Sequence, residues 1–334
     1  MNLHAAYIND EKLVNFRVLI TGGAGVIGSS LVQILNRSGL TSVTVLDNLS
    51  SSSISNVKEY LDNVDVKFIN GDIQNSNSLD SAMKDIDLVI HLAANADVRY
   101  SEGSATDMDL KISTIGTYNV LEAMRKNNVQ YMMYSSSSSV YGYSTKVPTD
   151  ESYGPLLPQS LYAASKLSSE ALVSSFSYMF GLKSLIFRFA NITAPIFRSK
   201  GRNVIPDFIM KLKNNPQELE ILGDGEQEKS YLYVEDCING MFSCAKTISK
   251  PVDIYNLGNV DSTKVSRIAE IIVDELGLKN VKFKYTGGKS GWKGDIPRTI
   301  INIEKAVKTG WRPEYNSDMA VRISARKIIR NYDI

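Results

Sequence analysis

The amino-acid sequence predicts an α/β fold, in which a doubly wound parallel sheet is joined to a smaller, discontinuous C-terminal domain. Short apolar runs alternate with longer amphipathic segments, as they do when each strand of a parallel sheet is followed by a helix. A glycine-rich stretch follows the first predicted strand and opens the first predicted helix. Beyond Asn191 the regular spacing is lost. A chain of 334 residues has room for one large domain and an appended smaller one.

The sheet is predicted from six apolar runs, and the segments between them have the periodicity of amphipathic helices. Strands are expected at residues 17–21, 42–47, 64–70, 87–93, 130–135 and 183–189. Helices are expected at residues 26–38, 78–84, 106–126 and 160–180. The first part of the chain is therefore a βαβ series, which favours a parallel sheet with helices on both faces.

The rest of the chain is predicted to complete the sheet domain and to cap its strand ends. We expect a helix near residues 207–213, a short strand pair around LEILGDG and KSYLYV, and then a helix at 234–248 and a strand at 253–257. The last region mixes helices with the loop TGGKSGWKGDIP. The expected parts are an N-terminal extension, a sheet domain and a substrate domain, at residues 1–16, at 17–191 with 232–260, and at 192–231 with 261–334.

Composition and charge exclude several classes of partner. A net charge of +1, with 43% hydrophobic and 22% charged residues, is typical of an ordinary globular protein. Because nucleic acids and anionic membranes need a clustered basic surface, neither is expected as a partner. The first residues lack the basic and apolar regions of a signal peptide, and no segment is long and apolar enough to span a bilayer. We expect a cytoplasmic protein.

The few cysteines and histidines argue against metal and triad chemistry. Cys237 and Cys244 lie in one predicted helix, without the spacing of a disulfide framework or a zinc site. His4 and His91 are the two histidines of the chain, so a histidine-built metal site or a Ser/His/Asp triad is not expected. We therefore predict that the protein has no bound metal.

The stretch TGGAGVIG predicts a dinucleotide site. It fits the spacing GxxGxxG at Gly22, Gly25 and Gly28, and also GxGxxG from Gly23. Glycines allow a tight turn and close approach of a pyrophosphate to the helix N-terminus. A glycine-rich turn without a ligand is the alternative, but its place between a strand and a helix favours a Rossmann site.

Acidic residues at the ends of the next two strands refine this prediction. Asp47 ends the second predicted strand, where a carboxylate accepts hydrogen bonds from ribose hydroxyls and repels a 2′-phosphate. We therefore expect NAD rather than NADP. Asp72 ends the third strand, where it either holds the adenine edge or only begins a turn.

Two further motifs indicate catalytic residues. Tyr162 and Lys166 of YAASK project from one face of a predicted helix. A tyrosine needs a lowered pKa to act as a base, and a neighbouring ammonium favours the phenolate. The alternative is a packed tyrosine beside a solvated lysine. The run SSSSSVYG, which begins at Ser135, follows a central strand, and ligands bind at the carboxyl ends of such strands.

Taken in order along the chain, these motifs resemble the extended short-chain dehydrogenase/reductase superfamily and, within it, the NAD-dependent epimerase/dehydratase family. The similarity covers nearly the whole chain through TGGAGVIG, LDN, GDI, HLAA, SSSSSVYG, YAASK, RFAN, NVIP, LGDG, YLYVED and GWKGD. KSYLYV and GWKGD look more like the archaeal-type UDP-glucose (UDP-galactose) 4-epimerases than the bacterial ones. With the spacing above, the resemblance implies cofactor contacts from Gly22, Gly25, Val26, Ile27, Gly28, Asp47, Asn48, Asp72, Ile73, Leu92, Ala93, Ala94, Tyr162 and Lys166.

The resemblance also implies a catalytic set and a reaction. The family's catalytic serine or threonine falls on Ser137, and its tyrosine and lysine fall on Tyr162 and Lys166. Dehydratases of the superfamily carry Asp-Glu where this chain has Ser138 and Ser139, and decarboxylases carry a glutamate at the second of these positions. A serine does not perform their proton chemistry at neutral pH. This difference favours C4 epimerisation of a UDP-hexose, UDP-galactose and UDP-glucose in the simplest case, over dehydration or decarboxylation.

Substrate contacts are implied at positions on both sides of the predicted cap boundary. The matching residues, with Ser137, are Asn191, Asn203, Lys229, Arg298 and Thr299. Lys229 and Trp292 stand where bacterial relatives have diphosphate-binding arginines, so the resemblance leaves Arg202, Lys293 or Arg298 as other candidates for that role. Thr299 is small where a tyrosine excludes N-acetylated sugars in some relatives.

Other activities on the same residues stay open from the sequence. They are a UDP-GlcNAc/GalNAc or UDP-glucuronate 4-epimerase, a dehydrogenase similar to threonine dehydrogenase, and an NAD-binding protein without activity. The resemblance also implies a homodimer, paired through the helices at 106–126 and 160–180.

Overall fold

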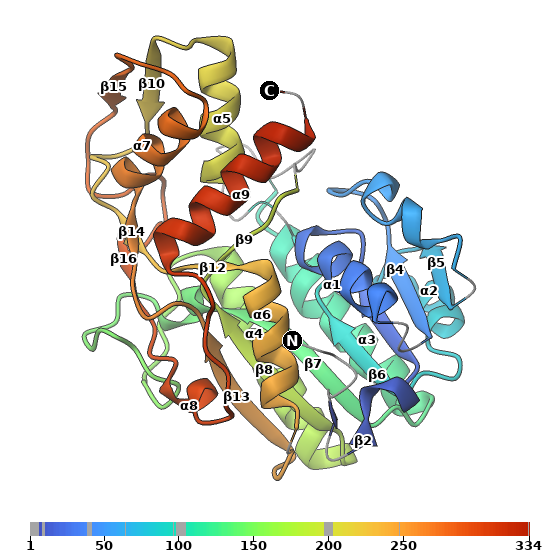
Figure 1. The fold of residues 1–334 in the computed structure, drawn as a ribbon. Coiled ribbons are helices and arrows are strands. Elements are labelled where there is room, and N and C mark those ends of the chain that lie inside the picture. The colour runs from blue at the N-terminus through green and yellow to red at the C-terminus, as the bar shows by residue number, and fades with distance from the viewer. Residues whose placement is uncertain are drawn as a thin grey trace.

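A computed structural model describes residues 7–8, 11–38, 42–63, 65–95, 97, 105–196, 203–246, 248–332 and 334. His4 and Arg202, which the sequence analysis considered, lie outside the described residues. The sheet and its helices form one part of the molecule, and the later segments of the chain form a second part beside the strand ends (Figure 1).

The first part is built on a seven-stranded parallel sheet, which confirms the predicted α/β fold class. The strand order is β13-β8-β7-β6-β3-β4-β5, so the chain reverses its direction of winding between β3 and β6, where such folds bind ligands. All six predicted strands are present with small shifts at their ends, and the strand predicted at 253–257 is the seventh. The strands are β3 (Val18–Thr21), β4 (Val43–Asp47), β5 (Val66–Asn70), β6 (Leu88–His91), β7 (Tyr131–Ser137), β8 (Lys183–Phe189) and β13 (Val252–Leu257).

Helices cover both faces of the sheet because its strand residues alternate between two apolar clusters. Val18 and Ile20 of β3 belong to a cluster with α1 and α6, whereas Leu19 belongs to a cluster with α2, α3 and α4. The helices are α1 (Val26–Arg37), α2 (Ser76–Ala82), α3 (Gly116–Lys126), α4 (Leu161–Phe180) and α6 (Val234–Cys244). Both faces of the sheet are therefore buried, as in other parallel sheets.

Two of the predicted helices differ in detail. Within the helix expected at 106–126, Leu110–Ile115 forms a π-helical turn before α3 begins; such turns often occur near functional sites. The helix expected at 234–248 ends at Cys244. The predicted helix at 160–180 is α4, which begins where Ser160 Oγ accepts a hydrogen bond from the Ala163 N–H and ends at the left-handed Gly181.

The described part of the N-terminal extension packs onto the sheet unit. β1 (Tyr7–Ile8) and β2 (Glu11–Lys12) form an antiparallel pair, and a 3₁₀ turn follows at Leu13–Asn15. Ile8 and Leu13 are fully buried in the same apolar cluster as α1 and α6. The extension thus contributes to the core.

The second part of the molecule has its own apolar cluster and several short strand pairs. Its helices are α5 (Val204–Asn214), α7 (Val265–Glu275) and α9 (Ser317–Asn331), whereas the short helix α8 (Glu304–Val307) lies against β13 and α6 of the first part. Its strands are β9 (Asn191–Thr193), β10 (Glu218–Ile221), β11 (Glu228–Lys229), β12 (Tyr231–Tyr233), β14 (Thr263–Lys264), β15 (Lys282–Tyr285) and β16 (Arg298–Thr299). We call this part the cap.

Strands do form around LEILGDG and KSYLYV, but the prediction that they pair with each other is wrong. β10 pairs with β15, β11 pairs with β14 and β16, and β12 pairs with β9. Gly223 and Gly225 both have positive φ angles and turn the chain after β10, so that it does not return along that strand. Within the described residues, no helix has both the length and the apolar character needed to cross a membrane.

Candidate active site

A cleft of about 1140 Å³ runs along the carboxyl ends of the sheet strands and continues between the sheet and the cap. Residues of the glycine stretch, of the serine run and of α4 line it on the sheet side. Residues of β9, α5, β11 and β16 line it on the cap side. Its volume exceeds the range of typical small-molecule sites, which occupy about 300–1,000 Å³.

The glycine stretch leaves no room for side chains where it turns into α1. Gly22 has a φ of +69°, and a Cβ there would lie 2.7 Å from the Ala93 backbone nitrogen. A Cβ on Gly28 would lie 2.5 Å from the Gly22 oxygen. Gly25 is the N-cap of α1, so unpaired amides at this helix end face the cleft and suit a pyrophosphate.

Asp47 joins this turn to the end of β4. Its Oδ2 accepts a hydrogen bond from the Ala24 N–H at 3.0 Å, and its Oδ1 accepts hydrogen bonds from the Leu49 N–H and the Ser52 hydroxyl, both at 2.8 Å. The carboxylate is buried but lines the cleft. Its orientation is therefore fixed before a ligand arrives, and a 2′-phosphate beside it would be repelled.

The end of β5 adds a second acidic group. Asn48 Nδ2 donates a hydrogen bond to Asp72 Oδ2 at 2.8 Å, and Asp72 Oδ1 accepts one from the Gln74 N–H. Ile73, Leu92, Ala93 and Ala94 line the same cleft. All residues predicted to contact the cofactor therefore line one continuous surface.

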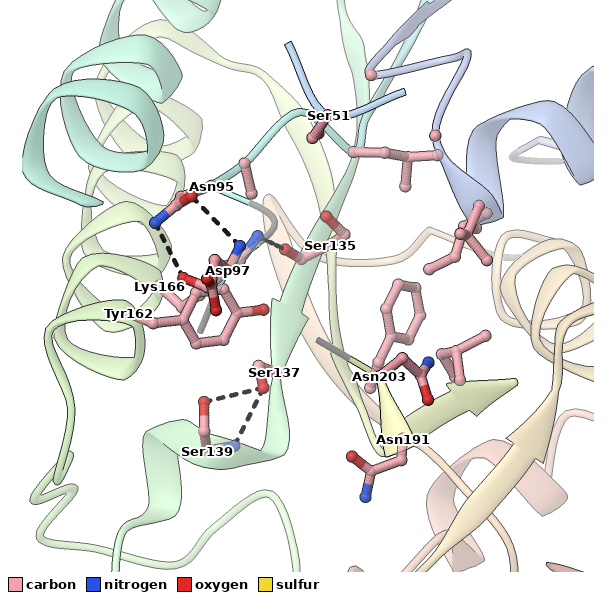
Figure 2. Close-up of a pocket in the computed structure, with 18 of the residues that line it drawn as sticks. Ser51, Asn95, Asp97, Ser135, Ser137, Ser139, Tyr162, Lys166, Asn191 and Asn203 are labelled. Atoms are coloured by element: carbon pink, nitrogen blue, oxygen red, sulfur yellow. Dashed lines mark hydrogen bonds between the residues drawn. The ribbon is translucent and has the colours of Figure 1, made fainter. Parts of the chain in front are cut away.

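Consecutive serines at the end of β7 each contact a different partner. The Ser135 carbonyl accepts a hydrogen bond from Lys166 Nζ at 2.6 Å, and the Ser136 hydroxyl donates one to Glu170 Oε1 at 2.5 Å. Ser137 faces the cleft near Tyr162 (Figure 2). The serine run is thus an ordered strand end that holds the α4 lysine and has Ser137 at the cleft beside Tyr162.

Lys166 is almost fully buried beneath Tyr162. Its Nζ lies 5.9 Å from the centre of the Tyr162 ring and 5.1 Å from that of Tyr134. Burial lowers the pKa of Lys166 to about 8, although Glu170 and Asp109 act against this shift. At neutral pH the ammonium persists, and its charge favours the phenolate form of Tyr162.

The Ser137 hydroxyl is oriented by the residue two positions later. Ser137 Oγ accepts hydrogen bonds from the Ser139 N–H at 3.2 Å and the Ser139 hydroxyl at 2.9 Å. Because both contacts use the oxygen as acceptor, the Ser137 proton can be donated to a ligand oxygen. Ser138 and Ser139, where dehydratases and decarboxylases have acids, both line the cleft.

The opposite wall of the cleft is formed by the cap and by the segment that joins it to the sheet unit. Asn191 and Asn203 lie across the cleft from Tyr162 and Ser137 (Figure 2). Asn203 Oδ1 also accepts a hydrogen bond from the Ile205 N–H at 3.3 Å and so caps α5. Thr299 of β16 lines this wall as well.

The two cationic candidates of the cap behave differently. The Lys229 ammonium pairs with the buried Asp295 carboxylate at the cleft. Arg298 Nε contacts Glu228 Oε2 at 3.1 Å, and Arg298 does not line the cleft within the described residues. The structure thus brings every predicted site residue to the cleft except Arg298. Lys293 is exposed and is also absent from the described lining.

This geometry agrees with comparisons to known proteins. The model of the NAD dependent epimerase/dehydratase family matches residues 18–258. The chain belongs to this family. The resemblance found in the sequence is therefore confirmed, and the cofactor of the family is NAD.

Three solved structures are similar over nearly the whole chain. A UDP-galactose 4-epimerase is 34% identical with a TM-score of 0.83, over 94% of this chain and 99% of that one. A UDP-N-acetylglucosamine 4-epimerase from Methanobrevibacter ruminantium, in complex with UDP-N-acetylmuramic acid, is 29% identical with a TM-score of 0.82, over 95% and 99%. A UDP-glucuronic acid 4-epimerase from Bacillus cereus, in complex with UDP-glucuronic acid and NAD, is 26% identical with a TM-score of 0.84, over 95% and 99%.

The residues of this family member fit NAD. The turn at Gly22 and Gly28 is a cradle that any Cβ would fill, and it opens onto free helix amides. Asp47 is held by hydrogen bonds at the end of β4, where its carboxylate could accept hydrogen bonds from a ribose. Tyr162 and Lys166 lie at the other end of the same surface, where the nicotinamide ribose would be held.

Sequence reasoning missed several lining residues. Ser50–Ser53 line the cleft directly after Asp47, and their position after this predicted cofactor contact was a usable signal. Asn95 Nδ2 donates a hydrogen bond to Asp109 Oδ1 at 3.1 Å, and burial raises the pKa of Asp109. Gln227 lines the cap wall. Asn95 and Gln227 come from segments without a local motif.

The surroundings of the buried His91, Cys237 and Cys244 disfavour a catalytic role. His91 contacts the hydroxyls of Thr21 and Thr117 at 2.6 and 3.0 Å, and burial lowers the pKa of His91 to about 3. Burial raises the pKa of the Cys237 and Cys244 thiols, which disfavours a nucleophilic thiolate. Among the described residues, no group of His, Cys, Asp and Glu side chains is arranged to hold a metal ion.

Proposed function

We propose that this protein catalyses C4 epimerisation of a UDP-hexose and, in the simplest case, interconverts UDP-galactose and UDP-glucose. The main support is the arrangement of Tyr162 and Ser137 in the cleft above the buried Lys166. The hydroxyls of Ser138 and Ser139 occupy the positions where dehydratases and decarboxylases of the family have acids. The site therefore has one base and one hydroxyl donor, as an epimerase requires.

Tyr162 is the proposed base. As phenolate it takes the proton of the sugar 4-hydroxyl while hydride leaves C4, and the Lys166 ammonium below it stabilises the phenolate. Ser137 donates a hydrogen bond to the same sugar oxygen, which becomes the oxygen of a 4-keto sugar. NAD, when bound, supplies the hydride acceptor and the hydride donor. Tyr162 then returns its proton after the keto sugar has turned its other face to the cofactor site.

Lys229 is the proposed contact of the substrate diphosphate. Among the described lining residues, Lys166 and Lys229 are the cationic side chains, and Lys166 is buried beneath the base. Lys229 has three N–H donors, so it can keep Asp295 as a partner and still donate to a phosphate oxygen. A lysine here acts as a point charge where a bacterial arginine would form a planar fork.

The test is conversion of UDP-galactose by purified protein without added NAD, followed by anion-exchange chromatography. We expect a stable mixture of UDP-galactose and UDP-glucose. Tyr162→Phe should lower the turnover about 10²–10⁴-fold, because it removes the proton acceptor. Tyr143→Phe is the matched control, since Tyr143 is exposed and does not belong to the described lining of the cleft. Accumulation of NADH in a parallel assay that contains threonine and added NAD, with no epimerisation of a UDP-sugar, would instead establish a dehydrogenase.

N-acetylated sugars are the second candidate substrates. Thr299 lines the cleft with a small side chain, and the similar UDP-N-acetylglucosamine 4-epimerase supports this option. We expect UDP-GlcNAc to be converted as well, and Thr299→Tyr to remove that activity while UDP-galactose conversion remains. If Thr299→Tyr leaves UDP-GlcNAc conversion unchanged, the assignment of this position is wrong.

We also propose a homodimer that forms through α3 and α4. Tyr118 on α3 and Tyr178 and Met179 on α4 are large apolar side chains with high exposure, which a partner would cover. Light scattering should give twice the mass of the chain, and Tyr178→Lys with Met179→Lys should reduce it to that of one chain. A wild-type protein with the mass of one chain would contradict this proposal.

A further inference from the structure

The cap wall of the cleft contains a buried glutamine whose side-chain oxygen has no hydrogen-bond partner. Gln227 precedes β11, is 2% exposed and lines the cleft. Its Oε1 is one of the few buried side-chain oxygens without a partner in the part of the chain that the structure describes. A buried acceptor without a partner is unfavourable. At the wall of a binding cleft, such an oxygen indicates a donor that the ligand supplies.

The orientation of the Gln227 amide is fixed by its neighbours. Its Nε2 donates a hydrogen bond to the Lys289 carbonyl at 3.3 Å. Since a carbonyl only accepts, the nitrogen of the amide must face Lys289 and the oxygen must point elsewhere. Gly223 leaves the space for this arrangement, because a Cβ there would lie 1.9 Å from Gln227 Nε2.

The surroundings of Gln227 suit the nucleoside part of a nucleotide. Gln227 and Lys229 are two residues apart on an extended segment and both line the cleft, so their side chains lie on one face of it. Lys229 is the proposed contact of the diphosphate. Leu222, Val265 and Trp292 line the same cleft. The Val265 N–H donates to the Gln227 carbonyl at 3.0 Å, which places an apolar side chain beside the glutamine.

We propose that Gln227 Oε1 accepts a hydrogen bond from the nucleoside of the substrate and thereby selects the nucleotide. The inference rests on the proposed function, because it requires a nucleotide sugar. Two donors have the required chemistry, namely the N3–H of a uracil base and a ribose hydroxyl. The apolar and aromatic side chains that line the same cleft would hold the base or ribose.

The test is calorimetric titration of the purified protein, with its bound cofactor, by UDP, N3-methyl-UDP, 2′-deoxy-UDP and 3′-deoxy-UDP. We expect UDP to bind about tenfold or more tightly than one analogue, and that analogue identifies the donor. Gln227→Leu should lose this preference. Gln227→Glu, which keeps an acceptor oxygen but loses the N–H to Lys289, should retain most of it. Gln217→Leu is the matched control, since Gln217 is exposed in the cap.

Each other outcome has a definite meaning. If the wild-type protein binds UDP and all three analogues equally, the inference about Gln227 is overturned and the proposed function stands. If Gln227→Leu and Gln227→Glu weaken all nucleotides by the same factor, Gln227 only fixes the Lys289 loop, and the inference is again overturned. If the wild-type protein does not bind UDP, the proposed function itself is contradicted.

Discussion

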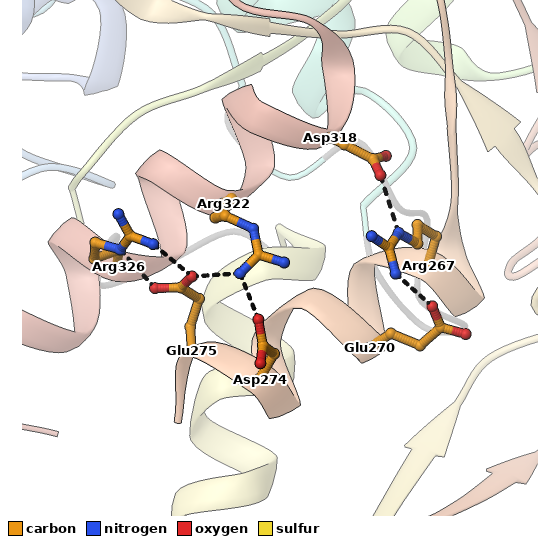
Figure 3. A network of polar contacts seen from close by, with 7 residues as sticks. All are labelled: Arg267, Glu270, Asp274, Glu275, Asp318, Arg322 and Arg326. Carbon is orange, nitrogen blue, oxygen red and sulfur yellow. Dashed lines mark hydrogen bonds and ion pairs between the residues drawn. The ribbon is translucent and has the colours of Figure 1, made fainter. Parts of the chain in front are cut away.

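Two sets of ion pairs in this molecule have opposite surroundings. In the sheet unit, Arg188 Nη2 lies 2.7 Å from Glu170 Oε2, and the two side chains are 3% and 6% exposed. In the cap, a network at the surface joins α7 to α9 (Figure 3). Its members are Arg267, Glu270, Asp274, Glu275, Asp318, Arg322 and Arg326, and most of them are exposed.

The buried pair is tied to the candidate active site, whereas the surface network is not. Glu170 Oε1 accepts hydrogen bonds from Arg188 Nε at 3.0 Å and from the Ser136 hydroxyl. The serines on either side of Ser136 hold Lys166 and face the cleft. Burying charge is expensive and is tolerated when every group is paired. The difference indicates that the buried pair positions the serine strand end, while the surface network only docks two helices.

Breaking the buried pair should have the largest effect. Arg188→Met leaves Glu170 buried without its cation, so we expect the free energy of unfolding to fall by about 3–5 kcal/mol. Denaturant unfolding followed by circular dichroism measures this change. The double variant Arg188→Met with Glu170→Leu should recover part of the loss, because no unpaired charge remains.

The control for this comparison is Arg330→Met, since Arg330 is exposed on α9. It should change the free energy of unfolding by less than about 0.5 kcal/mol. A loss of the same size in Arg188→Met and Arg330→Met would show that the loss in Arg188→Met does not come from its buried ion pair.

The same comparison explains what the sequence could predict. The strands, the turn at Gly22 and the pair of Tyr162 and Lys166 depend on short-range patterns, so periodicity and local motifs were sufficient to find them. Glu170 follows Lys166 by one helical turn and lies on the same face of α4. Nothing local, however, indicated that its partners would be Arg188 and Ser136, which come from two neighbouring strands.

Long-range pairing also explains the expectations that differ from the structure. Arg298 was expected in the substrate site, but β16 pairs with β11 so that Arg298 lies opposite Glu228, and the two side chains form an ion pair. Gln227 was overlooked because its unpaired oxygen depends on Lys289 and Gly223, which only the folded chain brings near it. The choice of strand partner therefore decides which polar side chains reach the cleft.

The buried Lys166 makes the stability of the sheet unit depend on pH. Burial lowers the pKa of Lys166 to about 8 from its ordinary value of 10.5, so below pH 8 the charged lysine destabilises the fold by an amount on the order of 3 kcal/mol. Lys166→Met should therefore abolish turnover and yet raise the free energy of unfolding at pH 7. Unfolding in denaturant at several pH values measures the difference between the two proteins.

The sign of the pH effect follows from proton binding. Between pH 8 and 10.5 the unfolded chain keeps the Lys166 proton while the folded protein loses it, so the stability of the wild-type protein rises relative to Lys166→Met. The advantage of the variant should disappear over this range. Lys308→Met is the control, because Lys308 is exposed. If the difference in the free energy of unfolding between wild type and Lys166→Met is the same at pH 7 and pH 10, the pKa of Lys166 is not lowered in the folded protein.

The surface network should give the smallest effect and the only one that depends on salt. Arg326 contacts Glu275 at 2.8 Å and is 62% exposed, whereas Arg322 stays beside Glu275 when Arg326 is removed. We expect Arg326→Gln to lower the free energy of unfolding only slightly at low salt, and by less still at about 1 M salt, where screening is strong. The loss in Arg188→Met should not change with salt, because its ion pair is shielded from counterions. Equal salt dependence of the two variants would contradict the view that the ion pair of the sheet unit is shielded and the network of the cap is exposed.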